Sequence, residues 1–174
     1  ENDLYMGESV DARLEIPGWN SDSRLDTKTW TKVQVREETP KGKLVGISGP
    51  PVRRIMELHP IAEPKEMHQW PKSKWLFDLG QNMVGRVRIK VNEPAGTTLT
   101  LKFAEVLKPD GHIYTDNLRA ARCTDVYTCK GVPDETWEPM FTFHGFRYVE
   151  LDGVSKPPTK DTIVGVVLHS DTPK

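Results

Sequence analysis

The chain has 174 residues, and its 24 Lys and Arg almost balance its 25 Asp and Glu, for a formal net charge of −1. Such a small charge gives no overall field to attract nucleic acid or an anionic membrane. No apolar run approaches the 18 residues of a membrane-spanning helix, and the opening residues lack the charged and apolar regions of a signal peptide. The length fits one domain with a real core, while 14 Pro and 13 Gly favour short strands and frequent turns.

Residues 1–40 differ from the rest of the sequence because they are polar, with scattered charges and little alternation. They predict an extended strap or linker from a preceding domain, and Trp19 and Trp30 are its expected buried anchors. The remaining residues, 41–174, are expected to form the folded domain.

Short strands are expected from residue 41 onward, at 44–47, 52–58 and 75–79, with a loop at 62–74. Next, Val87, Ile89 and Val91 alternate with a cationic row (Arg86, Arg88, Lys90), so one face of this strand should be buried and the other solvated. Leu99, Leu101 and Phe103 repeat the pattern after a loop at 93–96, which predicts a β-hairpin.

The second half of the chain has a turn at 108–111, followed by a stretch at 112–122 that reads as a loop or one helical turn capped by Thr115 or Asp116. Further strands are predicted at 124–129, 140–143, 146–151 and 163–169. No segment of ten residues has a helical period. About nine short strands predict an all-β, antiparallel β-sandwich with an extended N-terminal strap.

The two cysteines, Cys123 and Cys129, fall at either end of one predicted strand. Six strand residues span roughly 20 Å, whereas the Cα atoms of a disulfide lie within about 7 Å. We therefore expect two free, structural thiols.

Two polar clusters are candidate sites. Asp78, Gln81 and Asn82 could bind a sugar or an ion, or their side chains could satisfy the backbone of a bulged turn, which we favour. His144 and Arg147 flank Gly145, and an Arg among aromatic residues can stack on a sugar or clamp a carboxylate. The alternative, again favoured, is an Arg that ties strands or domains together.

A third cluster contains Asn117, Arg119 and Asp125, in a region where two Arg and two Asp suggest a salt-bridged loop. Its functional alternative is calcium binding through the oxygen atoms of Asp110, Asp116 and Asn117. No other cofactor or metal is expected.

A glycosidase needs two carboxylates on opposite sides of the scissile bond. The acidic residues, among them Glu105, Glu135, Glu138 and Glu150, show no such pair, and no other catalytic motif is present. We do not expect this chain by itself to be an enzyme.

Four segments, taken in order, carry a resemblance over nearly the whole chain: WLFDLGQNMVGRVRIKV, PAGTTLTLKFAEVL, PDGHIYTDNLRAARCTDVYT and EPMFTFHGFRYVEL. They resemble the concanavalin-like β-sandwich domain of bacterial α-L-rhamnosidases, glycoside hydrolase family seventy-eight. The opening YMGESVDARLEIPGW and GKLVGISGPPVRRI resemble the end of the preceding N-terminal domain of those enzymes. One departure is Arg86, where the family often has Trp.

The resemblance implies a parent enzyme that removes terminal α-L-rhamnose with inversion, using acidic residues of a C-terminal (α/α)6 barrel that has no counterpart here. No catalytic residue is therefore transferred. The chain itself is expected to be a non-catalytic scaffold between the N-terminal domain and the barrel. Its expected interface or sugar contacts are Asp78, Gln81, Asn82, Asn117, Arg119, Asp125, His144 and Arg147.

The second hypothesis is a carbohydrate-binding module that recognises L-rhamnose or a related sugar. It requires an exposed aromatic side chain beside polar groups, and Trp70, Trp75 and Tyr114 are the candidates.

Overall fold

The computed structural model describes residues 1–37, 41–67 and 73–172. In these ranges there is no α-helix, and the chain folds into ten β-strands with three short 3-10 turns. The strands are β1 Asn2–Asp3, β2 Gly7–Asp11, β3 Val52–Leu58, β4 Lys65–Met67, β5 Lys74–Val91, β6 Thr98–Ala104, β7 Thr124–Thr128, β8 Glu135–Trp137, β9 His144–Asp152 and β10 Ile163–Ser170. The 3-10 turns are η1 Ala12–Leu14, η2 Asp116–Leu118 and η3 Lys160–Thr162. None of the helical turns in these ranges is long and apolar enough to cross a membrane.

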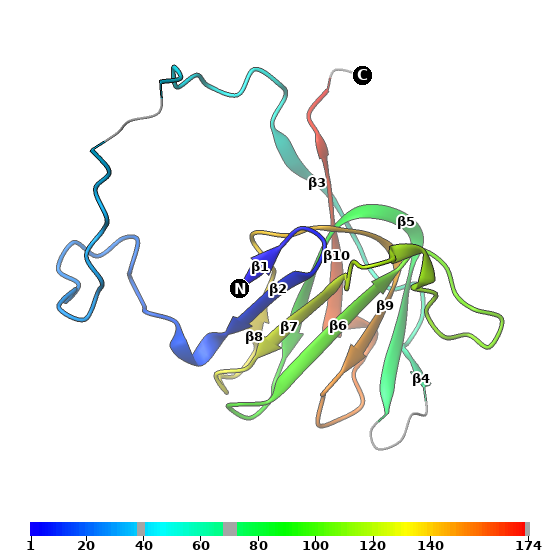
Figure 1. Cartoon of the computed structure of the whole chain (residues 1–174). Helices are drawn as coiled ribbons and strands as arrows, with labels where there is room; N and C mark the ends of the chain where they lie inside the picture. The colour runs from blue at the N-terminus through cyan, green and yellow to red at the C-terminus, as the bar shows by residue number, and fades with distance from the viewer. Residues whose placement is uncertain (38–40, 68–72, 173–174) are drawn as a thin grey trace.

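The strands form one curled sheet in the order β1-β2-β7-β6-β9-β5-β10-β3, with β4 and β8 also paired to β5 (Figure 1). Every pair is antiparallel except β2 and β7. The curl brings two layers face to face, so the all-β, antiparallel prediction is confirmed.

Strand β5 links the two layers because its 18 residues pair with different neighbours at its two ends. Its first part pairs with β9, and its last part pairs with β10 and β8. The register against β9 shifts between Asp78 and Met83, where a bulge interrupts the ladder. A bulge bends its strand and increases the local twist, which lets one strand serve both layers.

The core lies between the two layers and is filled by alternate residues of the long strands. Val87 and Ile89 are buried, while the intervening Arg86 and Arg88 are only half-buried, as the alternation predicted. The largest fully buried side chains are Phe77, Phe103, Phe146, Ile89, Leu99, Leu101, Leu151, Ile163, Val87, Val149, Val166 and Thr142.

The N-terminal residues join the sheet before the chain leaves it. Ser9 and Val10 of β2 lie in parallel register with Val126 and Tyr127 of β7. The hairpin turn is close to β7, because a Cβ added at Gly7 would lie 2.0 Å from the Thr124 carbonyl oxygen. Gly7 also has φ +107°, so glycine is required here on both counts.

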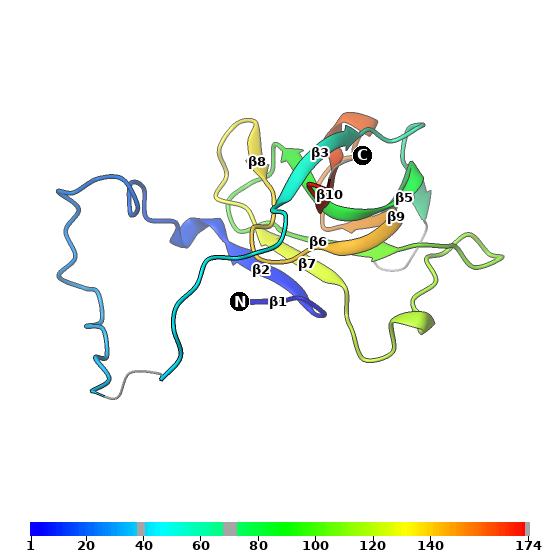
Figure 2. The same ribbon diagram turned by 90° about the horizontal axis from the view of Figure 1, so that it is seen from above.

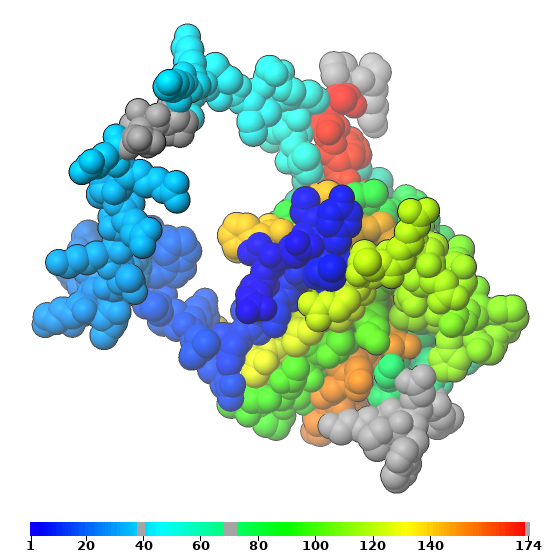
Figure 3. All heavy atoms as spheres, viewed as in Figure 1, coloured from blue at the N-terminus to red at the C-terminus, as the bar shows by residue number. Residues whose placement is uncertain are grey.

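After η1 the chain departs from the sheet and returns at β3, as Figures 1 and 2 show. Residues 15–37 and 41–51 contain no strand. The space-filling view shows this excursion beside the sheet rather than over it (Figure 3). Trp19 is 63% exposed and Trp30 is 45% exposed in this chain, so their role as anchors of a strap that packs on a neighbouring part stays a prediction. The boundary between strap and domain at residue 40 stays a prediction.

Four predicted elements are wrong. The hairpin of residues 87–91 and 99–103 does not form, because β9 pairs with both β5 and β6 and separates them. Residues 44–47 and 140–143 are not strands, since their backbone groups have no ladder partner. The loop expected at 62–74 contains β4, which pairs with β5.

Other local predictions are confirmed. The turn at 108–111 is closed by the Gly111 amide, which donates to the Lys108 carbonyl at 2.9 Å. Cys123 and Cys129 are both free and buried. The stretch at 112–122 contains one 3-10 turn, η2, although the Thr115 side chain makes no capping hydrogen bond to it.

Candidate functional site

A bidentate ion pair at the surface joins Asp78 of β5 to Arg147 of β9. The Arg147 Nε and Nη2 atoms donate to the two carboxylate oxygens of Asp78 at 2.8 and 2.9 Å. The guanidinium also lies 5.0 Å from the ring centroid of Tyr148. The hydrogen bond from Arg147 is the largest cause that lowers the pKa of Asp78, and the Gly80 amide adds to it. This bidentate pair ties two adjacent strands together at the bulge.

The other two residues of the 78–82 cluster are exposed at the same bulge. The Asn82 Nδ2 donates to Glu105 at 2.9 Å, and Gly80 donates its amide to the Asp78 Oδ1 at 2.7 Å. The favoured interpretation of a bulged turn satisfied by side chains is therefore confirmed for Asp78. Gln81 remains a candidate contact as a prediction.

His144 and Asp125 lie inside the protein, with side chains 2% and 1% exposed. The His144 Nε2 is 3.0 Å from the Asp125 Oδ1, and its Nδ1 is 3.3 Å from the Cys123 sulfur. Phe103 stacks on the imidazole at 4.3 Å between ring centroids. The Asp125 Oδ1 also accepts the Glu8 amide at 2.9 Å, so this cluster attaches β2 to the sheet.

The Cys-His-Asp order of this cluster is similar to that of a nucleophilic triad, but the thiol is not activated. Burial first, and then the nearby Asp125 and Glu105, raise the pKa of Cys123 to about 12. A reactive cysteine requires the opposite shift and access to solvent. The contacts of His144 and Asp125 are internal, and a contact of either with another molecule stays a prediction.

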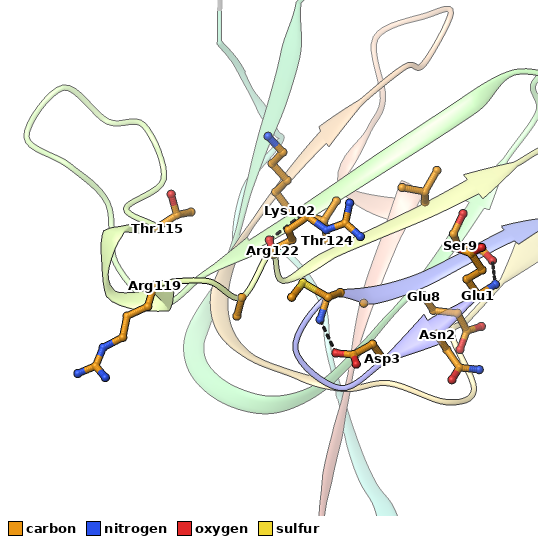
Figure 4. A pocket seen from close by; sticks show the side chains of 14 residues that line it. Glu1, Asn2, Asp3, Glu8, Ser9, Lys102, Thr115, Arg119, Arg122 and Thr124 are labelled. Carbon is orange, nitrogen blue, oxygen red and sulfur yellow. Dashed lines mark hydrogen bonds between the residues drawn. The ribbon is translucent and has the colours of Figure 1, made fainter.

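Asn117 and Arg119 lie on the loop around η2, and both are exposed. Arg119 lines an open hollow of about 650 Å³ between this loop and the β1–β2 hairpin. Figure 4 shows Thr115 and Arg119 at one end of the hollow and Glu1, Asn2 and Ser9 at the other. Arg119 also has φ 56° and ψ −111°, an unusual backbone conformation for a residue with a side chain.

The described residues contain no assembled group of acidic side chains that matches the predicted calcium site. Asp110 accepts the His112 amide at 3.0 Å and so closes its own turn. In the described ranges, no three or more His, Cys, Asp or Glu side chains gather as a metal site would require. Calcium binding by Asp110, Asp116 and Asn117 stays a prediction.

The two aromatic candidates for sugar binding that the structure describes, Trp75 and Tyr114, are only partly exposed. Trp75 is half-buried and packs against the core, and Tyr114 is half-buried, with its amide bonded to the Val106 carbonyl. Trp70 lies outside the described residues.

Sequence reasoning missed the buried acidic residues that hold loops in place. Glu135 accepts hydrogen bonds from the Tyr127 hydroxyl and from the amides of Lys130, Gly131 and Val132. Burial alone would raise the pKa of Glu135, but these hydrogen bonds together lower it. Glu8 similarly accepts the amides of residues 140 and 141. The Pro133-Asp134 turn is the only local feature of the sequence that points to the role of Glu135. No local feature points to the role of Glu8.

Comparisons with known proteins cover nearly the whole chain. Residues 68–169 match the family model of the bacterial alpha-L-rhamnosidase concanavalin-like domain, and residues 1–56 match that of the alpha-L-rhamnosidase N-terminal domain. An alpha-L-rhamnosidase of Streptomyces avermitilis is 46% identical over 173 residues, which are 98% of this chain but 16% of that protein. One from Formosa agariphila is 42% identical over 172 residues, 98% of this chain and 18% of its own.

Two solved structures give the same result. The Streptomyces avermitilis alpha-L-rhamnosidase complexed with L-rhamnose matches with a TM-score of 0.89 at 45% identity, over 99% of this chain and 16% of that one. Native alpha-L-rhamnosidase from Aspergillus terreus matches with a TM-score of 0.80 at 36% identity, over 98% of this chain and 19% of that one. The chain thus spans less than a fifth of the length of these relatives.

Proposed function

Because this chain belongs to the family of the bacterial alpha-L-rhamnosidase concanavalin-like domain, we propose that it is a non-catalytic accessory domain of a longer alpha-L-rhamnosidase. The parent protein would hydrolyse terminal α-L-rhamnosides. The accessory domain would act as a scaffold between an N-terminal domain and a catalytic domain of the same polypeptide.

One observation carries this proposal. Relatives that bear the name alpha-L-rhamnosidase match 98% of this chain with only 16–18% of their own length. Most of each relative therefore lies outside the matched part, which leaves ample chain for a separate catalytic domain. The matched length is that of a single domain.

The carboxylates of the chain support a non-catalytic role because several buried ones are bound to groups of this chain. Glu8 and Glu135 accept backbone amides, and Asp125 holds His144. A glycosidase acid needs a raised pKa, whereas the pKa values of Asp78 and Glu135 are lowered. These groups have the chemistry of structural acceptors.

The scaffold role assigns the Asp78–Arg147 pair to joining strands rather than to sugar recognition. Replacing Arg147 with Ala in the full-length protein should lower its melting temperature only slightly, since the pair is partly exposed. The KM for an aryl α-L-rhamnoside should not change. Melting curves and steady-state kinetics measure the two quantities, and Arg24→Ala, which breaks a more exposed ion pair, is the matched control.

Two results would contradict the proposal. Unchanged melting together with a raised KM for Arg147→Ala would make this pair a sugar contact. Turnover of an aryl α-L-rhamnoside by the purified 174-residue chain would show that it is itself catalytic.

A further inference from the structure

The segment that connects β8 to β9 is held from one side by the N-terminal hairpin. The Glu8 carboxylate of β2 accepts the Met140 amide at 3.1 Å and the Phe141 amide at 2.7 Å. The Thr142 hydroxyl donates to the Asp3 carbonyl at 3.2 Å. Figure 1 shows this segment, in gold, passing the β1–β2 hairpin. Three consecutive residues are thus fixed by polar groups from the other end of the chain.

Cationic side chains of the sheet hold the same segment from the other side. The Arg86 Nη1 donates to the Pro139 carbonyl at 2.7 Å. The Glu138 carboxylate, 10% exposed, is paired with Arg88 at 3.2 Å and with Arg54 at 3.0 Å. The segment is therefore anchored to β3 and β5 as well as to β2.

This anchored segment presents apolar side chains to solvent. Met140 is 68% exposed, Phe141 is 65% exposed and Phe143 is 47% exposed. Leu4 and Tyr5, which follow the bonded Asp3, are 56% and 72% exposed. We call these five residues the 140–143 patch. Exposed apolar side chains on segments that are held together by hydrogen bonds are typical of a protein contact site.

The chemistry of the patch fits a protein better than a sugar. Phe and Met carry no hydrogen-bonding groups suited to sugar hydroxyls. The neighbouring polar side chains, Glu8 and Thr142, already bond to the backbone of this chain. A partner therefore gains contact area here but few new hydrogen bonds, which matches an apolar protein surface.

We infer that the 140–143 patch is the surface on which another domain of the same polypeptide packs, through apolar side chains of its own. This inference rests on the proposed function, because the relatives carry more than four-fifths of their length outside the part matched here. A tethered domain is present at high effective concentration. It should therefore bind the patch in preference to a second copy of the chain.

Side-chain oxidation of the full-length protein tests the inference, because methionine oxidation follows exposure. The oxidation rate of Met140 by dilute hydrogen peroxide is compared with the rate of the same residue in the urea-unfolded protein, by mass spectrometry. Met83, which is 6% exposed, is the internal standard for a buried methionine. A covered Met140 should be protected more than about fivefold, and the same protection is expected for Met83.

Protection of Met140 below that threshold would overturn the inference. Protection that weakens as the protein is diluted would also overturn it, because the cover would then be a second copy. Neither result affects the proposed function, which is judged by rhamnoside turnover and by the Arg147→Ala variant.

A double variant gives a second, independent test. Met140→Ser with Phe141→Ser in the full-length protein should increase the rate of limited proteolysis between domains several-fold. Val106→Ser with Val132→Ser, at sites 51% and 42% exposed, is the matched control and should cleave as the wild type does. Equal cleavage rates for the two double variants would overturn the inference.

Discussion

The curled sheet and the excursion at residues 15–51 contain the same kinds of apolar residue in opposite environments. Leu101 and Ile89 of the sheet are 1% and 0% exposed, whereas Leu44 and Ile47 of the excursion are 99% and 95% exposed. The difference lies in the partners that each region finds. The sheet strands face one another across a core, while the excursion has no layer of this chain to pack against in the described residues.

This contrast shows that apolar composition alone does not bury a segment. Burial of a Leu or Ile side chain contributes roughly 1.5–3 kcal/mol, but only when a complementary surface is present. The excursion carries side chains suited to a second surface, in agreement with the match of residues 1–56 to an N-terminal domain model.

The largest expected effect tests this contrast directly. Phe103→Ala should lower the free energy of unfolding by about 3–5 kcal/mol, because it removes a fully buried ring and leaves a cavity. Ile47→Ala in the same chain should change it by less than about 0.5 kcal/mol. Urea denaturation measures both values. A large cost for Ile47→Ala would mean that the excursion is packed in solution, and the contrast would fail.

A smaller effect is expected at the attachment of the N-terminal hairpin to the sheet. Glu8→Ala should lower the free energy of unfolding by about 2–3 kcal/mol, since it leaves the amides of residues 140 and 141 without their charged acceptor. Ser9→Ala, at the exposed neighbouring position, is the control. If the two variants unfold at the same urea concentration, the hairpin belongs energetically to the excursion rather than to the sheet.

The smallest effect is the pH dependence of the Asp78–Arg147 pair. Arg147 lowers the pKa of the folded Asp78 carboxyl below its usual 3.8, so the pair stabilises the folded state above about pH 4. This stabilisation is lost as the pH falls through the lowered pKa and the carboxylate is protonated.

The free energies of unfolding of the wild type and of Asp78→Asn should therefore differ by less than about 1 kcal/mol at neutral pH. This difference should shrink below about pH 4. A difference that stays constant with pH would mean that the charge of Asp78 contributes nothing.

Much of the fold followed from alternation along the chain. The branched row at 87, 89 and 91 and the cationic row between them predicted both the strand and its buried face. The false hairpin shows the limit of this reasoning. Periodicity identifies strands but not their neighbours, and β9, far along the chain, lies between β5 and β6.

The site was harder to predict because its contacts join residues distant in sequence. Asp78 and Arg147 were both named as candidates, yet nothing local paired them across 69 positions. Residues 140–143 resemble a strand in sequence because three of the four are apolar and two of them are aromatic. The amides of Met140 and Phe141 instead donate to Glu8, 132 and 133 positions away, a partner that no short window of sequence contains.

The parallel pairing of β2 with β7 has a consequence for synthesis on the ribosome. Glu8 and its partner Asp125 are 117 residues apart. At about 5–20 residues per second, β2 emerges roughly 6–23 s before β7 is available to receive it. For that interval the N-terminal strand lacks its partner strand in the sheet, so its backbone is open to pairing with other chains.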